Sequence, residues 1–131
     1  VDLMQTLNSA HFKSAFDLAN FVQCGEDTAK CWDALRPYIV YIHIKDAVST
    51  DKENVLCGTG EGKIPELLHK AIVEEGYTGF LTLEPHLVLF DSLQSLETTD
   101  AKNIIRENKY KNGAEGYAAQ YHALCDILAK F

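Results

Sequence analysis

Three short β-rich segments alternate with helical segments along this chain, and this order restricts its fold more than any other feature. The strand candidates are residues 13–17, 39–45 and 80–84. The second is the clearest, because five of its seven residues are β-branched or aromatic. Helical patterns occupy residues 1–7, 26–36 and 65–75, and a last helix follows Gly113. Strands that alternate with helices predict a parallel sheet with crossover connections, so we expect an α/β fold.

The length and composition predict one domain over residues 1–131. A chain of 131 residues with 47% hydrophobic residues can bury a core of ordinary size. No repeat, linker or low-complexity segment divides it, and we expect the polar stretch 91–112 to be a solvated connection. No apolar run approaches the ~20 residues of a transmembrane helix, so a membrane partner is not expected.

The charge balance argues against nucleic acid as a partner. The net charge is −7, and only Arg36 and Arg106 are arginines. A phosphate backbone is bound by basic, arginine-bearing surfaces, which this composition does not provide.

The four cysteines suggest reduced thiols. They form no C-x-x-C pair and no zinc-finger spacing, and the first residues lack the pattern of a secretory signal. We therefore expect buried or half-buried thiols and a cytoplasmic location.

Ionisable residues lie at the carboxyl end of all three predicted strands. Side chains alternate between faces, so Asp17, His43 and Glu84 each end the polar face of their strand. In a parallel α/β sheet this end is where ligands bind. Two carboxylates and an imidazole suit a divalent cation such as Mn²⁺, Mg²⁺, Co²⁺ or Zn²⁺. The alternative is structural, with His43 as a core histidine and the carboxylates as helix caps.

A glycine-rich loop precedes the third helix. Gly58, Gly60 and Gly62 alternate with other residues, and such a loop can hold an anion with its backbone N–H groups. The spacing matches neither a dinucleotide-binding loop nor a P-loop, and a flexible turn is the favoured interpretation.

Four short motifs connect the chain to a known family. They are FDLAN at 16–20, YIHIKD at 41–46, GTGEG at 58–62 and LEPH at 83–86. In this order they resemble the sugar phosphate isomerase/epimerase family, the xylose-isomerase-like group of TIM barrels. The resemblance implies a partial (β/α)₈ TIM barrel that holds the last three βα units and lacks the amino-terminal half, since a whole barrel takes about 250 residues.

The resemblance also implies a chemistry for the strand ends. Asp17, His43 and Glu84 match three ligands of the family's divalent metal, whose remaining ligand is a Glu on an earlier strand. Glu84 would also be catalytic, as an acid/base at the carbon beside a sugar carbonyl. We expect an isomerase or epimerase of a sugar or sugar phosphate, and a fragment that is inactive alone. Lys45, His86 and Asn20 are the substrate-binding candidates, although Lys45 can equally pair with a barrel carboxylate.

Two other functions remain open at this stage. One is a non-catalytic partial barrel that binds sugar or assembles with another chain; we expect exposed strand edges to favour a homo-oligomer in either case. The other, remote, is an abasic-site endonuclease. That branch of the family carries a His where this chain has Asn20, and its further His ligands near the glycine loop are missing here.

Overall fold

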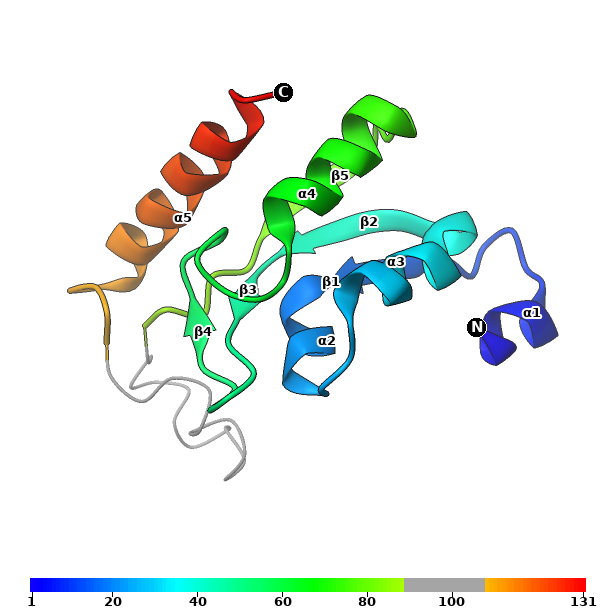
Figure 1. The fold of residues 1–131 in the computed structure, drawn as a ribbon, viewed down its shortest axis with the longest axis horizontal. Coiled ribbons are helices and arrows are strands. Elements are labelled where there is room, and N and C mark those ends of the chain that lie inside the picture. The colour runs from blue at the N-terminus through cyan, green and yellow to red at the C-terminus, as the bar shows by residue number, and fades with distance from the viewer. Residues whose placement is uncertain (89–107) are drawn as a thin grey trace.

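A parallel three-stranded sheet forms the centre of the fold. The computed structural model describes residues 1–88 and 108–131 (Figure 1). The strands are β1 (Ser14–Asp17), β2 (Ile39–Ile44) and β5 (Phe80–Leu83), and they lie in the order β1-β2-β5. Both pairings are parallel, which confirms the predicted α/β class and parallel sheet. Most of the polar stretch 91–112 lies outside the described residues.

Helices and a small ladder complete the described structure. The ladder pairs β3 (Asp46–Ala47) with β4 (Asn54–Val55) in antiparallel fashion. The helices are α1 (Asp2–Leu7), α2 (Leu18–Gln23), α3 (Thr28–Leu35), α4 (Ile64–His69) and α5 (Gly113–Leu128), with a 3₁₀ turn at Arg36–Tyr38 and a π-helical turn at Lys70–Glu74. Of these described helices, none is long and apolar enough to cross a membrane.

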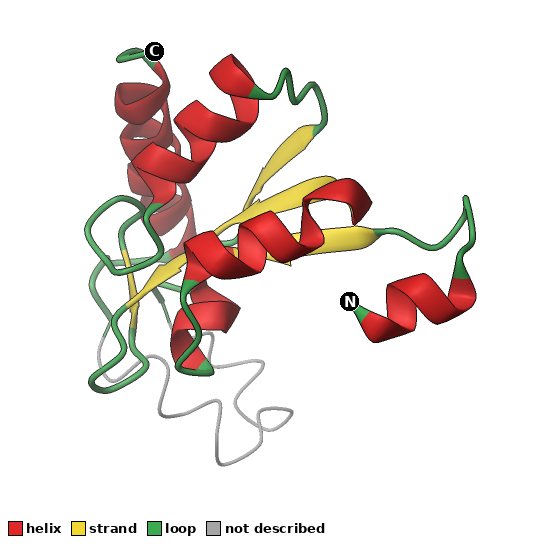
Figure 2. Ribbon diagram, turned by 45° about the vertical axis from the view of Figure 1, so that its right-hand side comes forward, coloured by secondary structure: helices red, strands yellow, loops and turns green. Residues whose placement is uncertain are grey.

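The helices bury one face of the sheet and leave the other open. Ile42 and Ile44 of β2 are fully buried in a core that includes Trp32 of α3 and Leu68 of α4. Figure 2 shows α3 and α4 lying over the strands on this side. On the opposite face Phe80 is 74% exposed. The polar strand ends lie on this face, where His43 and Glu84 are partly exposed and Asp17 is buried.

A β-bulge corrects the predicted alternation at the start of β2. Ser14 pairs with Ile39 but Ala15 pairs with Tyr41, so Val40 is an extra residue in β2. A bulge changes which face the flanking residues occupy. Ile39 consequently joins the core, whereas Val40, which strict alternation places on the same face as Ile42 and Ile44, is exposed. Beyond the bulge the predicted alternation holds as far as the site.

Two helices differ from their predictions. The sequence after Asp17 is rich in turn residues around Ala19 and Asn20 and predicts a turn. It instead forms α2, and the Asp17 side chain caps this helix by accepting the N–H of Asn20. In the α5 sequence, Tyr117, Tyr121, Leu124, Cys125 and Leu128 share one helical face, which predicts that this face is buried. Both tyrosines are exposed, and the buried side of α5 instead carries Gly116, Gln120, Leu124 and Ile127. The cause is Gln120, a polar residue that fills a polar site in the interior.

Candidate metal centre

Asp17 is fixed by the junction of β1 and α2. Its Oδ1 accepts a hydrogen bond of 3.0 Å from the backbone N–H of Asn20, which makes Asp17 the N-cap of α2. The proposed structural role as a cap is therefore real. It uses only one oxygen, however. Oδ2 is buried, and no described residue gives it a hydrogen bond of good geometry. That oxygen faces the open side of the sheet together with His43.

His43 lies beside Asp17 because the two residues are register partners on neighbouring strands. Its Nδ1 is 3.5 Å from Asp17 Oδ2 and 3.4 Å from Glu84 Oε2. The imidazole is half-buried on the open face, where it meets the ring of Tyr41 edge-on. The structural alternative of a core histidine is thus wrong, since His43 does not point into the aliphatic layer.

Glu84 follows β5 directly and is held by the end of β2. Its backbone N–H donates to the carbonyl of Ile44 at 3.2 Å, so the pairing of the two strands extends past the assigned end of β5. Tyr117 of α5 donates its hydroxyl to the carbonyl of Leu83 at 2.8 Å. These contacts direct the Glu84 carboxylate to the same edge as His43.

The three side chains have the spacing of a metal site. One ligand atom from each of Asp17, His43 and Glu84 lies within 4.8 Å of the others. Two ligands about 2.1 Å from one ion at a tetrahedral angle are about 3.4 Å apart. The two His43–carboxylate distances, 3.5 Å and 3.4 Å, agree with that value. The donor set therefore fits a divalent cation, provided that His43 presents Nδ1 without a proton.

Lys45 lies inside this cluster. Its ammonium is 3.0 Å from Asp17 Oδ2 and 3.2 Å from Glu84 Oε2. Partial burial raises the pKa of Glu84, but the charge and hydrogen bond of Lys45, with smaller effects of His43 and His86, outweigh burial and lower that pKa. Glu84 is therefore ionised near neutral pH. Of the two roles predicted for Lys45, pairing with carboxylates is the one that the structure contains.

The other two substrate-binding candidates lie at the margin of the cluster. His86 has a left-handed backbone, φ 46°, and its Nε2 is 4.0 Å from Glu84 Oε1. Asn20 contacts the site through its backbone N–H, which donates a hydrogen bond to Asp17 Oδ1. Binding of a substrate by either side chain remains a prediction.

The glycine loop does hold an anion, and the anion is the carboxylate of Asp46. Oδ2 accepts from the N–H groups of Gly58 and Gly60, each at 2.9 Å. Oδ1 accepts from Gly62 at 2.9 Å and from Ala47 at 3.0 Å. Asp46 is only 1% exposed. The favoured interpretation of a flexible turn is therefore wrong, and the loop has no free N–H groups of these residues for an external phosphate.

Asp46 and Gln120 are two functionally placed residues that were not predicted from the sequence. The Gln120 amide is fully buried; Nε2 donates to the carbonyl of Ile44 at 3.1 Å, and Oε1 accepts from the N–H of Cys57 at 3.1 Å. It therefore joins α5 to the end of β2 and to the loop beside Asp46. An Asp between a buried strand and a glycine-rich loop was a usable signal, whereas a lone Gln on a helix was not.

A methyl group at Gly60 is expected to destabilise the protein. A Cβ there would lie 2.5 Å from Asp46 Oδ1 and 2.6 Å from the Ala47 carbonyl. Overpacking of this kind costs about 1–3 kcal/mol. Urea denaturation of Gly60→Ala should show this loss. The matched control is Gly116→Ala on α5, where the Cβ meets Val88 at an ordinary 3.4 Å and helix propensity improves. Equal effects of the two variants would contradict the close approach.

The cysteines provide a probe of the same region. All four are free; Cys57 is buried and Cys31 half-buried, but Cys24 and Cys125 are exposed, so the expected burial is wrong for these two. Burial, with a smaller effect of the Asp46 charge, raises the pKa of Cys57 to about 12.

We expect iodoacetamide at pH 8 to modify Cys24 and Cys125 quickly and Cys57 slowly, because the thiolate is the reactive form. Peptide mass analysis over time measures the rates. The stability of the fold should fall as pH rises from about 9, the ordinary value, toward about 12, because the unfolded thiol loses its proton first. Rapid modification of Cys57 in the folded protein would contradict its burial.

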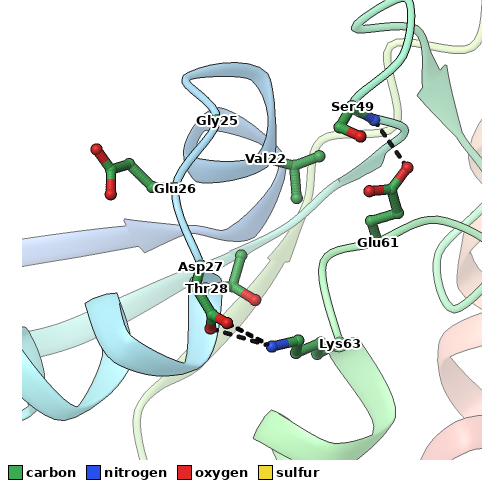
Figure 3. A pocket seen from close by; sticks show the side chains of 8 residues that line it. All are labelled: Val22, Gly25, Glu26, Asp27, Thr28, Ser49, Glu61 and Lys63. Carbon is green, nitrogen blue, oxygen red and sulfur yellow. Dashed lines mark hydrogen bonds and ion pairs between the residues drawn. The ribbon is translucent and has the colours of Figure 1, made fainter.

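A separate cavity of about 540 Å³ lies between the α2–α3 turn and the loops that carry Ser49 and Glu61 (Figure 3). Three of its four charged side chains, Asp27, Glu61 and Lys63, already have partners. Lys63 lies 3.0 Å from both oxygens of Asp27, and Glu61 accepts from the N–H of Ser49 at 2.9 Å. Asp17, His43 and Glu84 do not line this cavity. These pairs hold the loops together, so the strand-end cluster is the stronger candidate site.

No family model, curated protein or solved structure matches this chain. The fold and site define a mixed α/β protein with a polar cluster at the carboxyl edge of a parallel sheet. The feature that bears on function is therefore the cluster of Asp17, His43 and Glu84.

Proposed function

We propose that this chain is the carboxyl-terminal part of a divalent-metal-dependent sugar or sugar-phosphate isomerase/epimerase, built on a partial (β/α)₈ barrel. One observation carries the proposal. Asp17, His43 and Glu84 come from three neighbouring parallel strands and converge at their carboxyl edge, on the face that the helices leave open. This is where barrel enzymes place their chemistry. The motifs that resemble the isomerase/epimerase family contain these same three residues.

The proposed roles follow from the contacts of each residue. Asp17 Oδ2, His43 Nδ1 and a Glu84 oxygen would hold the ion, which when bound supplies positive charge beside an enediolate oxygen. The Glu84 carboxylate, kept ionised by its lowered pKa, accepts the proton from the carbon beside the carbonyl and returns it. His86, next to Glu84 Oε1, is placed to contact substrate hydroxyls. Tyr41 and Thr82 line the sheet face below the cluster.

Metal binding is the first test of this proposal. We expect the 131-residue chain to bind Mn²⁺ in calorimetric titration, and His43→Gln to weaken that binding by at least about tenfold, because an imidazole nitrogen is lost. His69→Gln is the control, since His69 lies on α4 and faces Glu74. Equal Mn²⁺ affinity in His43→Gln and the wild-type chain would contradict the site.

The open sheet supports a second expectation, that the chain assembles with further protein. Both β1 and β5 have an unpaired edge within the described sheet, and α1 has no buried residue. Exposed strand edges are rarely left unpaired in stable proteins. We expect light scattering to give a mass above 14.6 kDa, through pairing of identical copies. Sugar affinity that survives removal of the metal by a chelator would instead favour the non-catalytic binding module.

A further inference from the structure

Lys45 is in direct contact with the atoms that the proposed site needs for its metal. The ammonium is 3.0 Å from Asp17 Oδ2 and 3.2 Å from Glu84 Oε2, the same two oxygens that approach His43 Nδ1. The Lys45 side chain is only 9% exposed. Surface lysines pair loosely with solvent-exposed carboxylates, but this ammonium is buried together with Asp17, while Glu84 is partly exposed.

We propose that Lys45 is a resident cation that the divalent metal has to displace, so that this residue sets the metal affinity of the site. The inference rests on the proposed function and adds to it. It assigns Lys45 a role toward the metal, where the sequence had suggested a substrate contact.

Asp17 has one carboxylate oxygen available for a cation. Asp17 Oδ1 is already used, because it accepts the N–H of Asn20 at the start of α2. Only Oδ2 is left for a cation, and that atom is in contact with Lys45. An ammonium and a divalent ion on the same oxygen would lie within a few ångströms of each other. Two positive charges at that distance in a partly dry site repel strongly, so one has to withdraw.

Removal of the Lys45 charge favours metal binding through its effect on the metal-free site and through its effect on the metal-bound site. Without metal, Lys45 neutralises Asp17 and Glu84, and its removal leaves two carboxylates that attract a cation more strongly. With metal bound, removal of Lys45 eliminates repulsion between two cations. Each change favours the metal-bound state. A neutral residue at position 45 therefore has to bind metal more tightly, provided that the ligands stay in place.

Lys45→Met tests the inference, because Met keeps much of the apolar stem and removes the charge. We expect calorimetric titration with Mn²⁺ to give an affinity at least about tenfold higher than that of the wild-type chain. We also expect Mn²⁺ to raise the melting temperature of the variant by more than that of the wild type. Lys63→Met is the matched control, since Lys63 pairs with Asp27 away from the cluster and should leave Mn²⁺ affinity unchanged.

The outcomes separate this inference from the function on which it rests. Lys45→Gln serves as the second neutral variant if Lys45→Met does not fold, and it carries the same expectation. Unchanged or weaker Mn²⁺ affinity in a folded neutral variant would overturn the role of Lys45 and leave the metal site standing. Absence of Mn²⁺ binding in the wild type and in the variant alike would overturn both.

Discussion

Asp46→Asn should destabilise the protein by about 3–6 kcal/mol, because hydrogen bonds to a charged group contribute about 1.5–3 kcal/mol each and two lose their acceptor. The carboxylate accepts four backbone N–H groups, from Ala47, Gly58, Gly60 and Gly62. An asparagine has one acceptor oxygen, and its amide N–H groups would face two of these donors. A loss of this size is a large part of the 5–15 kcal/mol that stabilises an ordinary domain.

Urea denaturation followed by circular dichroism measures this effect. Asp33→Asn is the control, because Asp33 forms an exposed ion pair with Lys70 and should change stability by at most about 1 kcal/mol. Alkylation of Cys57, whose neighbour Gln120 meets the same loop, gives a second readout that should accelerate in Asp46→Asn. Equal stability of Asp46→Asn and the wild type would show that the loop does not depend on this carboxylate.

Glu84→Gln should reduce proton transfer by about 10²–10⁴-fold, the usual contribution of a positioned acid/base. The amide keeps the shape of the side chain and its oxygen, but it cannot accept a proton from carbon. The C–H bond beside the carbonyl breaks in this step and its electron pair forms the C=C bond of the enediolate. The carbonyl π electrons move to the oxygen, and the proton goes to the Glu84 carboxylate. The turnover number should therefore fall far more than the affinity for the substrate.

Deuterium exchange is the most direct measurement, because it needs only one base, whereas epimerisation needs two. D-fructose is incubated in D₂O with the chain at saturating Mn²⁺, and loss of the proton signals beside the carbonyl is followed by nuclear magnetic resonance. Glu66→Gln, on the exposed first turn of α4, is the control. Exchange at the same rate in Glu84→Gln and the wild type would remove Glu84 from the mechanism. Exchange without epimerisation would indicate that a second base from outside this chain is needed.

Local patterns were enough to predict the sheet and the three residues of the candidate metal centre. Side chains alternate along a strand, and parallel strands bring their carboxyl ends to one edge. Asp17, His43 and Glu84 could therefore be placed together without knowledge of any long-range contact, and the structure brings them together. The alternation failed only near Val40, where a bulge that depends on the partner strand adds a residue.

Contacts between distant segments decided the rest. Asp46 accepts from N–H groups up to 16 residues away, and Gln120 reaches Ile44 across 76 residues. The glycine-rich loop after Asp46 was a partial local signal for the first contact, whereas the second contact has none. The position of Lys45 between Asp17 and Glu84 likewise depends on three strands at once. The alternation of side chains along a strand depends on neighbouring residues, so it can be predicted from the sequence. The partner of a buried charge is set only by the tertiary structure. Desolvated polar groups need hydrogen-bond partners, and these partners come from whichever segments the fold places beside them.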